Sequence, residues 1–182
     1  MPRDSQFTSV ARLILLRQEK AMKPMTRALL LKILKGIRTA SQGEAAFMLY
    51  LLDRKAGLEA LDQALTSKVP IANNDATAAC VLIGTDATKQ LLVKSLGRCK
   101  LEQQHAAACA LSRFPSSSEV PELLNWMQAH DGISDPIGED KKIGDRTFRT
   151  YSMSDVAHTN MQGHIDQAIE SFRDLVPLIK EA

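Results

Sequence analysis

Cysteine and histidine are the residue types in this sequence best suited to metal binding or nucleophilic chemistry. His105 and Cys109 stand four positions apart, which places both side chains on one face of a helix. A zinc site needs three or four ligands, and no third candidate stands near this pair in the sequence. Cys80 and Cys109 each follow two alanines, a position that favours a small buried side chain. We therefore interpret both cysteines as packing residues rather than as metal ligands or nucleophiles.

Acidic residues between positions 131 and 145 are similar to a calcium-binding loop in composition only. They lack the alternating spacing and the closing glutamate that a calcium loop uses. The sequence also lacks a glycine-rich phosphate-binding motif and the Gly-x-Ser-x-Gly turn of many serine hydrolases. We therefore predict a protein that is not an enzyme, with no catalytic residue, no cofactor and no metal site.

Leucines recur along the chain at a fixed interval, and they indicate the elements that position every other residue. One column has a spacing of 31 residues and comprises Leu30, Leu61, Leu92 and Leu123. A second column follows four positions later and comprises Leu34, Leu65, Leu96 and Met127. Because residues at i and i+4 share one helix face, these columns predict one helix repeated at a fixed interval, as in a solenoid.

The predicted helices come in pairs. The first helix is expected over residues 8–22, with Pro24 ending it, and the second over residues 25–37. A third helix is expected to stop at a turn marked by Gly57, and residues 58–65 then form its partner. Each pair therefore contains one entering helix and one return helix that carries the leucine columns.

The following pair has the clearest start and stop signals. Asn74 or Asp75 is expected to cap the entering helix, and Gly84 is expected to stop it. Asp86 is expected to cap the return helix, which ends at Gly97. These signals agree with the interval of the leucine columns.

The regular pattern is lost beyond the fourth repeat. Residues 131–150 are rich in Gly, Asp and Lys without an apolar period, and they predict a long loop. Residues 151–180 predict a terminal helix pair that divides near Gly163 and covers the end of the core. The prediction is one domain over residues 1–182, with core repeats at about 26–128.

Composition favours a soluble globular protein. Hydrophobic residues make up 45% and charged residues 24% of the 182 positions, while aromatic residues make up only 4%. No apolar run reaches the roughly 18 residues that a membrane span needs. The first residues lack the pattern of a secretory signal, and three cysteines form no disulfide framework. We therefore predict a cytoplasmic location and no membrane span.

The repeating unit resembles a known family. A helix pair of about 30 residues, with Ala-Ala in its first helix, Gly at the corner and Leu-Leu in its second, resembles HEAT repeats, in particular the short class named after phycobilisome lyases. The units run from Ala45-Ala46 to Leu65, from Ala78-Ala79 to Leu96 and from Ala107-Ala108 to Met127. The resemblance implies an all-α fold, a right-handed α-α superhelix forming a solenoid of about five helix pairs. It also implies a non-catalytic scaffold or adaptor that binds a protein or peptide on the surface lined by the second helices.

The positions opposite the leucine columns are the candidate contacts for such a partner. They form a polar to basic ridge, which suggests a polar protein surface as the ligand. The candidate residues are Lys32, Lys35, Glu59, Gln63, Gln90, Lys94, Asn125, Trp126 and Gln128. For any one of these residues, a solvated helix position without a partner is the simpler explanation.

Trp126 is the most distinctive of these residues. It occupies the column of Ile33, Ala64 and Ser95, so a large ring replaces smaller side chains. Trp is enriched among interface hot spots, and it also shields exposed core. Both interpretations of Trp126 stay open at this point.

An alternative function is binding of nucleic acid or another polyanion. Residues 1–38 carry a net charge of +7, whereas the remainder carries −5. The basic residues that could form a phosphate-binding stripe, beside Lys32 and Lys35, are Arg12, Arg17, Lys20, Lys23, Arg27 and Arg38. Solvated charges on a terminal helix pair explain the same pattern.

HEAT-like enzymes provide a further alternative. Some proteins of this type excise alkylated bases from DNA and hold the lesion between several aromatic side chains. This chain contains only one Trp and two Tyr, so it lacks most of the aromatic side chains that such a site uses. Phycobilin lyases have similar repeats, but no residue pattern here indicates their chemistry. We therefore favour the scaffold over DNA glycosylase or lyase activity.

Overall fold

The computed structural model describes residues 4–17, 22–35, 40–99, 101–114, 121–122, 140–143, 146–149 and 153–180. The helices are α1 (Asp4–Leu16), α2 (Lys23–Lys35), α3 (Gln42–Leu52), α4 (Arg54–Ala64), α5 (Pro70–Ile83), α6 (Asp86–Arg98), α7 (Leu101–Leu111), α9 (Met153–Ser171) and α10 (Val176–Ile179), and the strands are β1 (Asp140–Ile143) and β2 (Arg146–Arg149). The body of the fold is therefore helical, as predicted. Across these ranges, none of the helices has the length and apolarity that a bilayer crossing requires.

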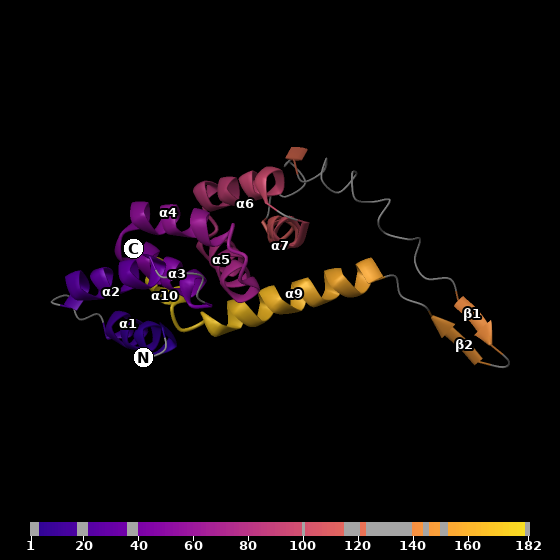
Figure 1. The fold of residues 1–182 in the computed structure, drawn as a ribbon, viewed down its shortest axis with the longest axis horizontal. Coiled ribbons are helices and arrows are strands. Elements are labelled where there is room, and N and C mark those ends of the chain that lie inside the picture. The colour runs from indigo at the N-terminus through magenta and orange to yellow at the C-terminus, as the bar shows by residue number, and fades with distance from the viewer. Residues whose placement is uncertain are drawn as a thin grey trace.

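Three helices form the middle of the molecule. α3, α5 and α7 pack side by side and constitute the middle layer (Figure 1). α4 and α6 pack against each other on one side of this layer, and α9 runs along the other side across α5 and α7 (Figure 1). α1 and α2 pack against α3 at the N-terminal end. The middle layer is therefore covered from two sides.

The leucine columns mark buried positions, as predicted. Leu30 in α2, Leu61 in α4 and Leu92 in α6 are fully buried. In the second column Leu65 and Leu96 are buried and Leu34 is partly buried against the same core. Leu123 and Met127 lie outside the described residues. Burial of each leucine stabilises the folded state by about 1.5–3 kcal/mol. The column leucines therefore supply much of the free energy that holds the return helices against the core.

The helices of the middle layer are buried on nearly all sides. In α3 the side chains from Ala45 to Leu51 are all buried, and in α7 so are those from Ala106 to Leu111. Two packing partners per helix explain why these segments have no polar face. On the α9 side, the Phe47 ring contacts the Phe172 ring with centroids 5.0 Å apart and a tilt of 50°, a favourable aromatic geometry. The Ala pairs predicted to lie in the core do lie there.

The C-terminal segment differs from the predicted terminal helix pair. α9 continues through Gly163 as one helix of 19 residues, and a tight turn at residues 172–175 leads to the short α10. α9 lies along α5 and α7 instead of stacking on the end of the array (Figure 1). The predicted division at Gly163 is wrong, because α9 continues through this glycine as a regular helix and an added Cβ there would meet no atom within 4 Å.

Gly57 is a contact residue and not the predicted turn. The turn lies at Asp53, whose side chain accepts a hydrogen bond from the Ala56 backbone N–H at 3.1 Å and so caps α4. Gly57 lies one turn inside α4 and is buried. A Cβ at Gly57 would lie 2.1 Å from the Tyr50 Cα, so only glycine permits this approach of α3 and α4.

Prolines begin helices in this fold, which shifts several predicted boundaries. α1 spans Asp4–Leu16 rather than 8–22, and Pro24 is the second residue of α2 instead of the end of α1. Pro70 opens α5, so Asn74 and Asp75 lie inside this helix and do not cap it. A proline in the first helical turn removes no intrahelical hydrogen bond, which explains both positions.

The junction between α5 and α6 matches its sequence signals closely. Gly84 ends α5 in the left-handed conformation with φ of 64°, as predicted for a C-terminal glycine. The cap of α6 is Thr85 rather than Asp86, because the Thr85 and Thr88 side chains bond each other's backbone N–H groups in a capping box. α6 then ends at Arg98, one residue beyond the predicted Gly97.

A β-hairpin lies within the segment predicted as a loop over residues 131–150. β1 and β2 pair antiparallel, with Asp140 opposite Arg149 and Ile143 opposite Arg146. This hairpin corrects the prediction of a structureless loop for residues 140–143 and 146–149. Residues 131–139 lie outside the described part of the chain.

We predict that Leu61→Ala lowers the free energy of unfolding by about 2–5 kcal/mol, because it leaves a cavity in a fully buried position. Urea unfolding followed by circular dichroism measures the change. Gln63→Ala, an exposed site on the same helix, is the control and should change stability by less than about 0.5 kcal/mol. Equal effects of the two substitutions would contradict the packing described here.

A second prediction compares two glycines inside helices. Gly57→Ala places a methyl group against the Tyr50 backbone and should destabilise the protein by about 1–3 kcal/mol. Gly97→Ala meets no atom within 4 Å and should stabilise α6 by about 0.5–1 kcal/mol. Thermal unfolding of both variants shows whether each substitution lowers or raises stability. A stabilising Gly57→Ala would show that α3 and α4 do not touch at this point.

Candidate functional site

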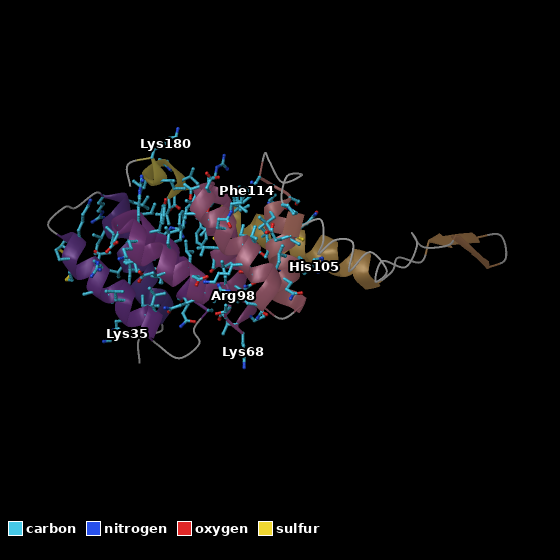
Figure 2. All side chains as sticks on the ribbon, turned by 90° about the horizontal axis from the view of Figure 1, so that it is seen from above. Lys35, Lys68, Arg98, His105, Phe114 and Lys180 are labelled. Atoms are coloured by element: carbon cyan, nitrogen blue, oxygen red, sulfur yellow. The ribbon has the colours of Figure 1, made fainter. Side chains whose placement is uncertain are left out.

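The outward sides of the return helices form the candidate surface. It comprises the described partner-binding candidates, which we call the second-helix surface: Lys32, Lys35, Glu59, Gln63, Gln90 and Lys94. All six are exposed, and they come from α2, α4 and α6. Figure 2 shows Lys35 projecting at one edge of the molecule and Lys180 at the opposite edge. The side chains thus point into solvent, as their positions opposite the buried leucines predict.

The second-helix surface repeats with the leucine columns. Lys32, Gln63 and Lys94 are separated by 31 residues each, and each stands two positions after a buried column leucine. Glu59 and Gln90 have the same separation and stand two positions before Leu61 and Leu92. Equivalent helix positions on successive helices therefore present polar groups at regular intervals. Glutamine both donates and accepts hydrogen bonds, whereas lysine only donates.

An ion-pair cluster at Asp62 connects α4 to α6 beside this surface. The Lys94 Nζ donates to Asp62 Oδ2 at 2.9 Å, and the Arg98 guanidinium also donates to the Asp62 carboxylate. Partial burial opposes ionisation of Asp62, but the hydrogen bonds from Arg98 and Lys94 outweigh it and lower the pKa of Asp62. Lys94 therefore has a structural role as well as an exposed position. Sequence reasoning missed Asp62, because only the packing of α4 on α6 brings the three residues together.

A second ion pair fixes the position of α2 relative to α4. The Arg27 guanidinium donates to Asp53 Oδ2 at 3.0 and 3.2 Å. The hydrogen bond from the Ala56 N–H and the contact with Arg27 lower the pKa of Asp53. One carboxylate thus caps α4 and binds α2, so Arg27 is not a free cation for a polyanion.

Arg12 joins three separate segments and is likewise engaged. Its Nη1 donates to Glu44 Oε1 at 3.3 Å, and its Nε donates to Asp174 Oδ2 at 3.0 Å. Its Nη2 donates to Asp174 and to the Ser171 carbonyl oxygen. The hydrogen bond with Asp174 raises the pKa of Arg12 and lowers that of Asp174. Arg12 therefore anchors the end of α9 to α1 and α3.

Only some of the other candidates of the phosphate-binding stripe lie within the described residues. Arg17, just after α1, and Lys23, the first residue of α2, are both exposed. Lys20 and Arg38 lie outside the described residues, as do Asn125, Trp126 and Gln128 of the partner-binding set. The described part of the chain does not bring the basic residues into one free stripe, because Arg12 and Arg27 are bound to carboxylates.

Cys80 and Cys109 lie in the core, as the sequence predicted. Cys80 and Cys109 are buried, and Cys99 is half-buried. Burial raises the pKa of Cys80 far above its usual range and that of Cys109 to about 11. Because the thiolate is the reactive form, these thiols are poor nucleophiles. Within the described ranges, no group of three or more His, Cys, Asp or Glu side chains is arranged to hold a metal ion.

Asp75 is a carboxyl group with a strongly raised pKa, and sequence reasoning assigned it only a capping role. The close contact of Gly43 with the Ala72 carbonyl and the Asp75 Cβ brings α3 against α5, so Glu44 lies near Asp75. Burial, with a smaller contribution from the negative charge of Glu44, raises the pKa of Asp75 to about 7. This carboxyl group therefore titrates near neutral pH.

A comparison of the chain with protein-family models, curated proteins and solved structures finds no match.

The Asp75 carboxyl group predicts an unusual pH dependence of stability. Its pKa in the folded protein, about 7, lies above the ordinary value of 3.8, so the folded state binds the proton more tightly than the unfolded chain. Its contribution to stability is full below about pH 4 and is lost as the pH rises to about 7. Asp75→Asn should therefore stabilise the protein by about 2 kcal/mol at pH 8 and have little effect at pH 4.

Denaturant unfolding of both proteins at pH 4, 6 and 8 measures this difference. Glu170→Gln, an exposed carboxylate on α9, is the control and should leave the pH profile unchanged. A constant difference between wild type and Asp75→Asn at all three pH values would contradict titration of Asp75 near neutrality.

Proposed function

We propose that this chain is a non-catalytic scaffold that binds a protein or peptide partner on the second-helix surface. We further propose that its helix pairs form a HEAT-like solenoid, a right-handed α-α superhelix. The alternation of α1/α2, α3/α4 and α5/α6 supports this arrangement, as do the side-by-side packing of α3, α5 and α7 and that of α4 and α6. Three free cysteines support a reducing compartment such as the cytoplasm.

The observation that carries the proposal is the repeated exposure of Lys32, Gln63 and Lys94. α4 packs against α6, and packed helices lie about 8–10 Å apart, so Gln63 and Lys94 offer hydrogen-bonding groups at this interval along an extended ligand. An extended polypeptide has backbone carbonyl and N–H groups that such side chains can bind. α9 covers the other side of the middle layer, which leaves the return helices as the broad solvent-facing side of the described array.

The charges of the second-helix surface indicate the chemistry of the partner. Lys32 and Lys35 form no ion pair with other described residues, whereas Glu59 is the single acidic member of the surface. A partner with exposed carboxylates is therefore favoured by charge, and exposed charges mainly raise the association rate. Polyanion binding by the N-terminal helices has less support, because Arg12 and Arg27 already bind carboxylates.

The test is affinity capture from an extract of the source cells, followed by titration of the purified partner. We expect the triple variant Lys32→Ala, Gln63→Ala, Gln90→Ala to weaken binding at least about tenfold, or about 1.4 kcal/mol, because it removes side chains from three helices. The matched control is Glu170→Ala, Arg173→Ala, Lys180→Ala, whose positions lie on the C-terminal segment.

Circular dichroism must show the same helix content for both triple variants. Unchanged binding by the second-helix variant would overturn the proposal. A partner that proves to be nucleic acid, with retention on heparin that is lost between low and physiological salt, would instead support the polyanion alternative.

A further inference from the structure

A pocket lies between α5 and α9, away from the second-helix surface. Its volume is about 270 Å³. α5 contributes Ile71, Asn74 and Asp75, and α9 contributes His164, Gln167, Ala168 and Ser171. The walls combine one carboxyl group, two amides, an imidazole and a hydroxyl group with two apolar side chains. Pockets that bind small molecules have this composition of apolar walls and a few polar groups.

Asp75 is the carboxyl group that lines this pocket. Its side chain is half-buried, and no described residue donates a hydrogen bond to its carboxylate. The neighbouring Glu44 is satisfied by Arg12 at 3.3 Å, so its charge is shared with a cation while that of Asp75 is not. A carboxylate that is partly removed from water and has no cation beside it is less stable than a paired one, and groups of this kind gather at binding sites.

The remaining walls limit the size and shape of a ligand. Ile71 is 59% exposed and Ala168 is buried, so an apolar strip adjoins the carboxylate. The pocket is slightly smaller than the roughly 300–1,000 Å³ typical of drug-sized ligands. A ligand of about five to ten non-hydrogen atoms with a short alkyl chain fits these dimensions.

We propose that this pocket binds a small aliphatic amine, whose ammonium group donates hydrogen bonds to Asp75 while its alkyl chain lies along Ile71 and Ala168. An ammonium group carries three donors and a full positive charge, which are what the carboxylate lacks. The amide oxygens of Asn74 and Gln167 accept its remaining hydrogen bonds. The ligand also offsets the repulsion between Asp75 and Glu44.

The proposal has a pH dependence that follows from the groups around Asp75. An aliphatic amine stays protonated between pH 6 and 8, so the ionisation of Asp75 decides the affinity. Because this carboxyl group titrates near pH 7, affinity should be about tenfold lower at pH 6 than at pH 8. His164 on α9 also lines the pocket. Glu44 on α3 and its partner Arg12 on α1 complete the charged surroundings.

The experiment is an NMR titration of the full chain with n-butylamine at pH 8, with butan-1-ol as the uncharged probe of similar size. We expect saturable shifts of the His164, Gln167 and Ala168 signals with a Kd of about 1–10 mM, and at least tenfold weaker binding of butan-1-ol. Asp75→Asn, which is expected to fold at least as stably as wild type, should weaken butylamine binding at least tenfold. Glu170→Gln carries the same charge change on α9 outside the pocket and should bind as wild type does.

Two results would overturn the proposal: absence of saturable shifts at pH 8, or equal affinities of wild type and Asp75→Asn for butylamine. Neither bears on the second-helix surface, because that surface is tested with a different ligand and different substitutions.

Discussion

The packing of α3, α5 and α7 between two sets of helices is the constraint on which the rest of the structure depends. A helix covered on two sides needs small side chains, so that its neighbours can approach closely without leaving voids. The Ala pairs at Ala45-Ala46, Ala78-Ala79 and Ala107-Ala108 meet this need, and all six side chains are buried. Gly43 and Gly57 permit the closest approaches, toward α5 and toward α4. The positions of α4 and α6 on one side and α9 on the other follow from this middle layer.

The sequence was sufficient to predict those parts of the fold that depend on local pattern. The leucine columns predicted the buried side of α2, α4 and α6, because period and burial are linked wherever one helix face meets a core. The exposure of Lys32, Gln63 and Lys94 followed from the same geometry. Gly84 was identified correctly because a left-handed helix end has a strong local preference for glycine. The resemblance to HEAT repeats and the binding of a partner stay predictions.

What the sequence could not show depends on contacts between distant segments. The role of Gly57 requires knowledge that Tyr50 lies against it, since a glycine at a turn and a glycine at a helix contact look alike in sequence. The position of α9 depends on Arg12, Asp174 and Phe172, which are far apart along the chain. The hairpin was overlooked although Gly144-Asp145 between two short segments is a sequence typical of a two-residue β-turn. Asp75 was taken for a cap because Pro70 was not recognised as the first residue of α5.

The carboxylates on the two sides of the molecule differ in whether a cation binds them. On the return-helix side, Asp62 and Asp53 each bind a cation, so the ion pairs there hold helices in register and leave the outer side chains in water. On the α9 side, Arg12 binds Glu44 and Asp174, whereas Asp75 lines the pocket and accepts no hydrogen bond from a described residue. Packing of α5 against α9 does not require a carboxylate at this position, since an alanine or an asparagine would fill it without the cost of partly desolvating a charge. The proposed amine would supply the donor that Asp75 lacks, in keeping with the tendency of such groups to lie where a site is kept ready for binding.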